Sequence, residues 1–128
     1  MIILKCLIDY KINNGEQEII KNNIKAIIKD NELIFKDSND SIKVIINSDN
    51  IIMIKDDLSS KTTLNFIQSK KTDSEYYIKS LNIYVDLKIL TNVLTINKER
   101  INIEYEVWFD SEYSGKFKYE INIKEMSK

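Results

Sequence analysis

Histidine and proline are absent from this chain of 128 residues, and glycine occurs only at Gly15 and Gly115. Histidine is the commonest general base and a member of the Ser-His-Asp and Cys-His catalytic groups, so the sequence predicts no active site of these kinds. It also predicts no histidine-based metal centre and no bound cofactor. Two isolated glycines cannot form a glycine-rich phosphate-binding loop.

Cys6 is the only cysteine, which excludes a disulfide within the chain and fits a reducing compartment. It alternates with Leu4, Ile8 and Tyr10 along one apolar face, so we interpret it as a small core residue and not as a nucleophile. No apolar run is long enough to cross a membrane, and Lys5 and Asp9 interrupt the opening one. We therefore expect a cytoplasmic protein.

Charge of either sign is not in excess. The net charge is −1 with a pI near 5.6, and the lysines are spread along the chain. This distribution gives no electrostatic footprint for nucleic acid or for an anionic membrane. From the length we expect one domain covering residues 1–128, present as a monomer or a weak homodimer.

The most informative pattern in the sequence is the alternation of apolar and polar residues. Apolar residues occupy every second position from Ile101 to Phe109 and again from Phe117 to Ile123. Successive side chains of a strand point to opposite faces, so this period indicates half-buried antiparallel strands. Turn signals recur at short intervals, and the predicted strands lie near residues 2–12, 16–29, 32–36, 42–47, 51–55, 62–69, 75–79, 81–96, 100–110 and 116–124. We predict an all-β meander that is closed or nearly closed into a barrel of about 8–10 strands.

The apolar pattern changes phase once, from odd positions up to Ile89 to even positions from Leu90 onwards. A shift of one residue within a long strand predicts a β-bulge near Ile89-Leu90. The inward positions are mostly bulky Ile, Leu, Phe and Tyr, with Ala26 the only alanine. Such side chains favour a filled barrel over a deep cup.

Several features taken in order resemble the YwiB-like family of small bacterial proteins of unknown function. They are the hairpin Leu7 to Ile20 around Asn-Gly-Glu, the stretch Thr91-x-x-Leu94-x-Ile96, the run Ile101-x-Ile103-x-Tyr105-x-Val107 and the ending Ile121-x-Ile123-Lys124-Glu125. The resemblance implies a calycin-like (lipocalin-like) barrel and carries no known activity. The middle differs: an Arg and a Gly are expected where the chain reads Ile54-Lys55-Asp56-Asp57, and a Tyr-Thr-Pro-x-Gly turn where it reads Tyr77 to Asn82. Lys55 and Tyr77 retain part of that pattern.

Polar residues interrupt the inner face near the last strands. If residues 97–100 form a turn, Ile96 faces Ile101 and Asn92 faces Tyr105. If Phe109 faces Phe117, then Val107 faces Tyr119, which leaves Tyr119 diagonal to Tyr105. The sequence then places Asn92, Tyr105 and Tyr119 together on the inner face, with Thr91 at the edge of this group, which makes four polar side chains. Buried hydroxyls and amides need partners, so the four either bond one another or orient a ligand.

Three hypotheses follow. The first is a module that binds a small, partly apolar ligand in a small or shallow pocket through these four residues. The second is a filled structural or protein-interaction barrel. The third is a lyase-type enzyme that uses Tyr105, Arg100 and a glutamate, although a fold resemblance does not establish activity. A pocket below about 300 Å³ argues against the first.

Two smaller predictions concern charged positions. The acids Asp56-Asp57 and Asp37 with Asp40 lie in turns, where they are either solvated or spaced for a weak calcium site. Trp108 alternates with Glu104 and Glu106, so we expect it on the outer face, opposite Lys118. The same register pairs Asp110 with Lys116.

Overall fold

The computed structural model describes residues 3–97 and 99–127, with side chains described up to residue 124. Ile2 and Lys98, which belong to a predicted strand and a predicted turn, lie outside these residues. The ten strands are β1 (Ile3–Asn13), β2 (Glu18–Lys29), β3 (Glu32–Asp37), β4 (Asp40–Ile46), β5 (Ile51–Asp56), β6 (Ser60–Phe66), β7 (Lys71–Ile78), β8 (Ile83–Ile96), β9 (Arg100–Phe109) and β10 (Glu112–Ser127). Among the residues described, no helix is long and apolar enough to cross a membrane.

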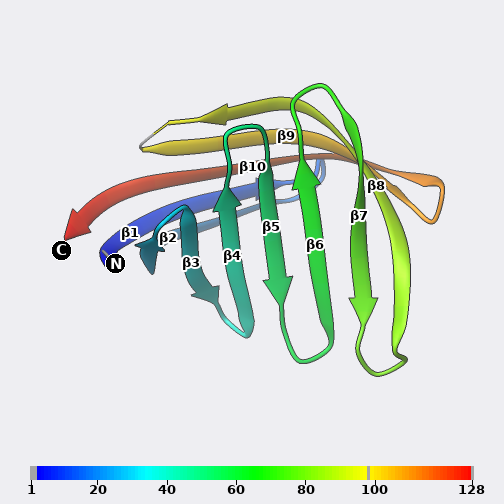
Figure 1. Cartoon of the computed structure of the whole chain (residues 1–128), viewed down its shortest axis with the longest axis horizontal. Helices are drawn as coiled ribbons and strands as arrows, with labels where there is room; N and C mark the ends of the chain where they lie inside the picture. The colour runs from blue at the N-terminus through cyan, green and yellow to red at the C-terminus, as the bar shows by residue number, and fades with distance from the viewer. Residues whose placement is uncertain (1–2, 98, 128) are drawn as a thin grey trace.

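Each strand pairs antiparallel with the next one along the chain, and β10 pairs with β1 to close the ring. The predicted all-β, closed meander is therefore confirmed. Figure 1 shows β3 to β7 standing side by side, with β1, β2, β9 and β10 crossing behind them in another direction. β8 joins the two layers, because its first part pairs with β7 and its second part with β9.

Large side chains fill the middle of the barrel. On the front strands one inner row runs Leu33, Val44, Met53 and Leu64 across neighbouring strands, and all four are buried. Ile8, Ile101, Ile103 and Ile121 meet this row from the other layer with no exposed surface. Cys6 lies in the same core, as expected, and burial raises the pKa of its thiol.

The β-bulge of β8 lies at Asn92, between Thr91 and Val93, two residues later than predicted. The Gln68 side chain holds it from the turn after β6: its amide donates to the Asn92 carbonyl at 2.8 Å, and its oxygen accepts from the Leu94 N–H at 2.7 Å. The pairs Ile96–Ile101 and Leu94–Ile103 form as predicted. Before the bulge the register changes, so Thr91 and not Asn92 lies opposite Tyr105.

The last hairpin is tighter than predicted. Asp110 and Ser111 both have positive φ, 49° and 72°, and alone link β9 to β10. This is the backbone of a two-residue hairpin turn, whose twist matches that of the flanking strands. Gly115 then lies opposite Val107, because a bulge in β10 shifts the register between Tyr113 and Gly115. The predicted pairs Phe109–Phe117, Val107–Tyr119 and Asp110–Lys116 are therefore wrong, although Tyr119 remains diagonal to Tyr105.

The ring is incompletely paired where β2 meets β3. Only four residue pairs join them, Ala26–Lys29 of β2 with Glu32–Phe35 of β3. β2 continues past this point along β1, with a bulge at Asn23 (φ 57°) whose N–H donates to Asp9. Residues 18–25 of β2 pair with no strand on the β3 side among the residues described. We call this opening the seam.

Candidate ligand site at the seam

Thr91 and Tyr105, two of the predicted site residues, lie opposite each other on the inner face. Thr91 is 0% and Tyr105 8% exposed. The Tyr105 ring packs against Phe66 and Phe117 at centroid distances of 4.9 and 5.5 Å. Its burial was predicted, and this burial raises the pKa of its hydroxyl. The expected hydrogen bond is absent, since no described residue bonds that hydroxyl.

Asn92 does not join them. The bulge turns it to the outer surface, where it is exposed and donates to Glu106 Oε2 at 3.1 Å. The predicted four-residue cluster is thus reduced to three inner residues. Asn92 is the extra residue of the bulge, so its side chain does not follow the inward–outward alternation of the strand.

Tyr119 is fully inside the barrel and stacks on Tyr10 with centroids 5.9 Å apart and rings 2° from parallel. Tyr10 donates its hydroxyl to Asp37 Oδ2. The hydroxyls of Tyr119 and Thr91 are buried and have no hydrogen-bond partner among the described residues. Burial raises the pKa of Tyr119. A buried hydroxyl without a partner is uncommon, because leaving it unpaired costs free energy.

Lys55 faces the same space from the opposite layer. It belongs to an inner row that runs Phe35, Ile42, Lys55, Thr62, Tyr76 and Val85, one row beyond the filled core. Its Nζ lies 5.6 Å from the centroid of the Tyr119 ring. No described carboxylate lies within 4 Å of that Nζ. Desolvation lowers the pKa of Lys55, against the opposing charges of Asp40 and Asp37.

Two acids border Lys55. Asp37 accepts from Tyr10 and lies 3.9 Å from Lys21 Nζ across the seam. Burial, then a hydrogen bond with Asp57, raises the pKa of Asp40. The N–H groups of Ser60 and Ser59 donate to Asp57 and lower its pKa. Within the residues described, no group of three His, Cys, Asp or Glu side chains is placed to hold a metal ion.

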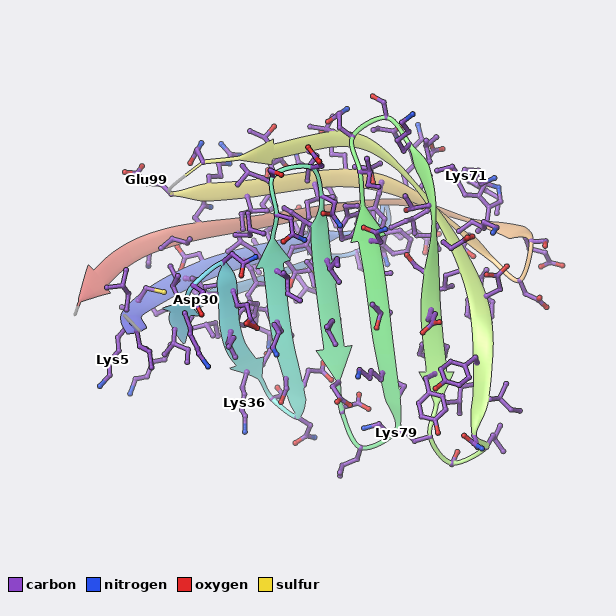
Figure 2. The ribbon with its side chains drawn as sticks, viewed as in Figure 1. Lys5, Asp30, Lys36, Lys71, Lys79 and Glu99 are labelled. Carbon is purple, nitrogen blue, oxygen red and sulfur yellow. The ribbon has the colours of Figure 1, made fainter. Side chains whose placement is uncertain are left out.

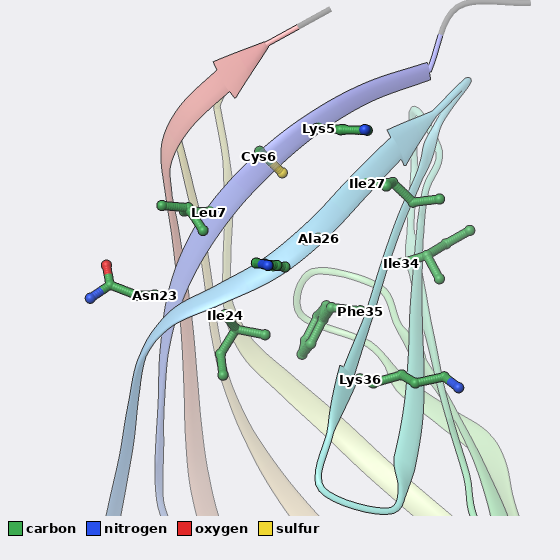
Figure 3. Close-up of a pocket in the computed structure, with 11 residues that line it drawn as sticks. Lys5, Cys6, Leu7, Asn23, Ile24, Ala26, Ile27, Ile34, Phe35 and Lys36 are labelled. Atoms are coloured by element: carbon green, nitrogen blue, oxygen red, sulfur yellow. The ribbon is translucent and has the colours of Figure 1, made fainter.

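The seam opens into a cleft with a volume of about 1390 Å³. Figure 3 shows Ile24 and Phe35 on its two sides, where β2 and β3 separate. Its lining is mostly apolar: Cys6, Leu7, Ile24, Ala26, Ile27, Ile34 and Phe35. Phe35 links it to the polar side chains, because its ring lies 5.5 Å from that of Tyr10 and its row contains Lys55.

Three lysines border the cleft: Lys5, Lys25 and Lys36. All are exposed, and Lys5 and Lys36 lie on the side of the molecule where β1, β2 and β3 meet (Figure 2). No described carboxylate lies within 4 Å of their amino groups. The cleft edge is therefore positive, although the whole chain carries a net charge of −1.

A second hollow of about 600 Å³ lies over β9 and β10 and includes Asn92 and Tyr105 among its lining residues. The rest of its lining is largely charged and outward-facing, Glu104, Glu106, Lys116 and Lys118. Trp108 is also on this outer face, as predicted. Its neighbours differ, since Tyr113 and not Lys118 lies opposite and Lys71 Nζ is 4.1 Å from its ring. Arg100 pairs with Glu120 at 3.2 Å and, by alternation, lies on the opposite face of β9 from Tyr105.

Sequence reasoning missed Lys55, Tyr10 and Asp37 as members of the site. Lys55 continues the odd-numbered inner pattern of Ile51 and Met53, so its phase contained the signal. The seam had no such signal, because it depends on how far β2 follows β1 after the bulge at Asn23.

Comparison with known proteins gives a fold and no family. No family model matches the chain. The crystal structure of the ywiB protein from Bacillus subtilis is similar, with a TM-score of 0.56 and 10% identity over 96% of this chain and 92% of that one. At this identity the likeness shows that the two share a fold.

The chain is also 29% identical over 102 residues to eukaryotic translation initiation factor 3 subunit M of Dictyostelium discoideum. The match covers 79% of this chain but 25% of that protein, so the chain spans about a quarter of this relative.

Proposed function

We propose that this barrel binds a small, partly apolar molecule in the seam cleft. The observation that carries the proposal is the cleft itself: about 1390 Å³ of open volume with a mostly apolar lining. Small-molecule sites combine an apolar lining with a few polar groups that fix the ligand's orientation.

The polar groups define what the ligand carries. Outside this lining but inside the same barrel, Tyr119 has a buried hydroxyl without a partner and Lys55 an amino group without a carboxylate within 4 Å, among the residues described. Both can donate to an oxygen atom. The apolar body of the ligand then lies between Ile24 and Phe35, and a negative group is favoured by Lys5, Lys25 and Lys36. Thr91 and Tyr105 lie outside the lining of the cleft, and Asn92 takes no part.

A calycin-like, lipocalin-like classification suits this use, because such barrels commonly hold one small ligand. A cytoplasmic location and the absence of a catalytic role belong to the same proposal. The lyase alternative has less support, since Arg100 and Tyr105 point to opposite faces of β9. The binding experiment below decides between ligand binding and the alternative of a filled, structural barrel.

The experiment is a fluorescence titration with 8-anilinonaphthalene-1-sulfonate, an apolar probe with one anionic group. We expect saturable binding of one probe per chain. The double variant Lys25→Glu/Lys36→Glu places negative charge at the cleft edge and weakens binding by about tenfold, equivalent to roughly 1.4 kcal/mol. Lys116→Glu makes the same charge change at the second hollow and leaves the affinity unchanged.

Non-saturable fluorescence, or an affinity that depends on Lys116 and not on the cleft lysines, would overturn the proposal in favour of a filled barrel or of the second hollow. Circular dichroism of each variant checks that the β-sheet content is retained.

A further inference from the structure

The first part of β2, residues 18–25, is an open edge of the sheet. It pairs with β1 on one side and with no strand on the other among the residues described. β3 does not continue alongside it, because β3 ends at Asp37 and turns back into β4. Figure 3 shows the two strands separating beyond Ile24 and Phe35. Backbone N–H and C=O groups without a neighbouring strand are a template on which a further strand can pair.

The open edge also exposes two large apolar side chains. Ile19 is 46% and Ile20 56% exposed. Ile19 lies opposite Ile12, which packs against the core, so Ile19 is on the inner face and Ile20 on the outer face. A strand added along this edge would therefore cover apolar surface on both of its faces.

The charges of the open edge favour an acidic partner. Lys21 points to the inner face, where its Nζ lies 3.9 Å from Asp37. This distance is longer than a hydrogen bond, so the amino group can still donate to another carboxylate. Lys25 has no carboxylate within 4 Å among the residues described. Glu18, the one acid of residues 18–25, is already held by Lys11 at 3.0 Å.

We propose that an extended, acidic segment of a partner protein adds to the open edge as an antiparallel strand, in the position that a longer β3 would occupy. Its acids lie opposite Lys21 and Lys25, and its apolar residues lie opposite Ile19 and Ile20. Strand addition of this kind combines backbone hydrogen bonds, which give affinity, with side-chain pairs, which give specificity.

A second copy of this chain fits the edge less well. Two identical edges that pair antiparallel about a two-fold axis bring their Lys21 side chains together on the inner face, where like charges repel. An inward-pointing charged residue is one of the features that prevent a sheet edge from pairing with itself. The same lysine attracts a segment that carries a carboxylate at this position.

The test uses wild-type protein and the fluorescein-labelled heptapeptide Asp-Val-Thr-Glu-Val-Val-Thr. Antiparallel to β2, it places its acids opposite Lys25 and Lys21, with Asn22 and Asn23 sharing one position at the bulge. We expect saturable binding in fluorescence anisotropy. Lys21→Glu weakens binding by at least about tenfold and restores it for the peptide in which lysine replaces glutamate. Lys116→Glu, the same charge change on β10, leaves the affinity unchanged.

A second pair of peptides tests the backbone hydrogen bonds. The N–H groups of a strand point alternately to its two sides, so only every second one faces β2. We therefore compare two heptapeptides that are N-methylated at alternate residues in opposite phase. Strand addition predicts that only one of them binds, whereas attraction through side chains alone predicts that both bind.

The inference is overturned by the absence of saturable binding, by equal binding of the two methylated peptides, or by equal effects of Lys21→Glu and Lys116→Glu. It is also overturned if light scattering shows a dimer of the free protein in which the amides of residues 18–25 are protected from exchange, because a second copy then occupies the edge. Lys21 does not line the seam cleft. Binding of the naphthalene probe is therefore unchanged in Lys21→Glu, and the proposed function stands or fails independently.

Discussion

Tyr10 and Tyr119 have the same ring and stack on each other inside the barrel, but among the described residues only the hydroxyl of Tyr10 has a partner. Removing a hydroxyl costs stability when its hydrogen bond is lost and little when there was none. The pair therefore provides an internal comparison, in which one atom is deleted from each of two neighbouring aromatic rings.

We predict that Tyr10→Phe lowers the free energy of unfolding by about 1–2 kcal/mol, because its bond to the Asp37 carboxylate is charge-assisted. Tyr119→Phe, the matched control, changes it by less than about 0.5 kcal/mol or raises it. Urea unfolding of the two variants measures both values. Equal losses would contradict the hydrogen-bond assignment.

The raised pKa of Asp40 gives a second prediction, with a definite sign. A carboxyl whose pKa is raised by folding favours the folded state when protonated and disfavours it when ionised. Asp40→Asn therefore stabilises the protein at pH 7, and the difference disappears as the pH falls below the ordinary Asp pKa of about 3.9. Asp57 has a lowered pKa, so Asp57→Asn destabilises at pH 7. Thermal melting of both variants from pH 3 to pH 7 measures the two profiles, and a parallel response would contradict the assignment.

Alternation predicted the inward direction of Tyr105 and Tyr119 without any structure, whereas Thr91 faces inward because the bulge falls after it. It did so because each lies in phase with fully buried neighbours, such as Ile103 beside Tyr105. Lys55 was in phase too, but a charged residue in an apolar pattern is normally assigned to a strand end or a surface. The inward direction of Lys55 becomes clear only from its neighbours on the adjacent strands, Ile42 and Thr62, which the sequence of one strand does not reveal.

β8 is the strand that connects the two layers, because it bends from the front layer to the back layer. Its bulge was predicted from the phase change, but not its position. A change from odd to even inward positions shows only that a bulge lies between the last clear odd position and the first clear even one. In β8 these are Ile89 and Leu94. The position within that interval is set by Gln68, which is distant in sequence.

We predict that Gln68→Ala lowers the free energy of unfolding by about 1–2 kcal/mol, since it removes two hydrogen bonds to the backbone at Asn92 and Leu94. Gln17→Ala, in the exposed turn after β1, is the matched control, because only the backbone N–H and carbonyl of Gln17 take part in hydrogen bonds. Chemical denaturation compares the two. A loss of equal size in the control would show that the Gln68 side chain does not hold the bulge.

The turn of the last hairpin was also predicted at the wrong residues. The predicted strands left residues 111–115 for the turn, but Asp110 and Ser111 form it and Gly115 lies at a bulge inside β10. Aspartate and serine tolerate positive φ poorly compared with glycine, yet polar short side chains do occur there. The alternation of β10 was correctly predicted only after that bulge.

At the scale of the whole molecule, the barrel is filled through its middle and open along the seam. The filled part follows from bulky inward residues, as the sequence indicated. The seam follows from strand lengths and pairing: β2 has 12 residues and β3 has 6, and only residues 26–29 of β2 pair with β3, so residues 18–25 have no neighbour on that side among the residues described. Lys21 reaches across it towards Asp37.

The central claim is that a ligand binds at this seam. The most direct measurement is the set of backbone amide shifts in 1H–15N spectra during titration with 8-anilinonaphthalene-1-sulfonate. The seam site predicts that the largest changes fall on Ile24, Phe35 and Lys55, and that Val44 and Ile121 in the filled core change little. Changes confined to Asn92, Glu106 and Lys116 at the second hollow, or no saturable change anywhere, would contradict it.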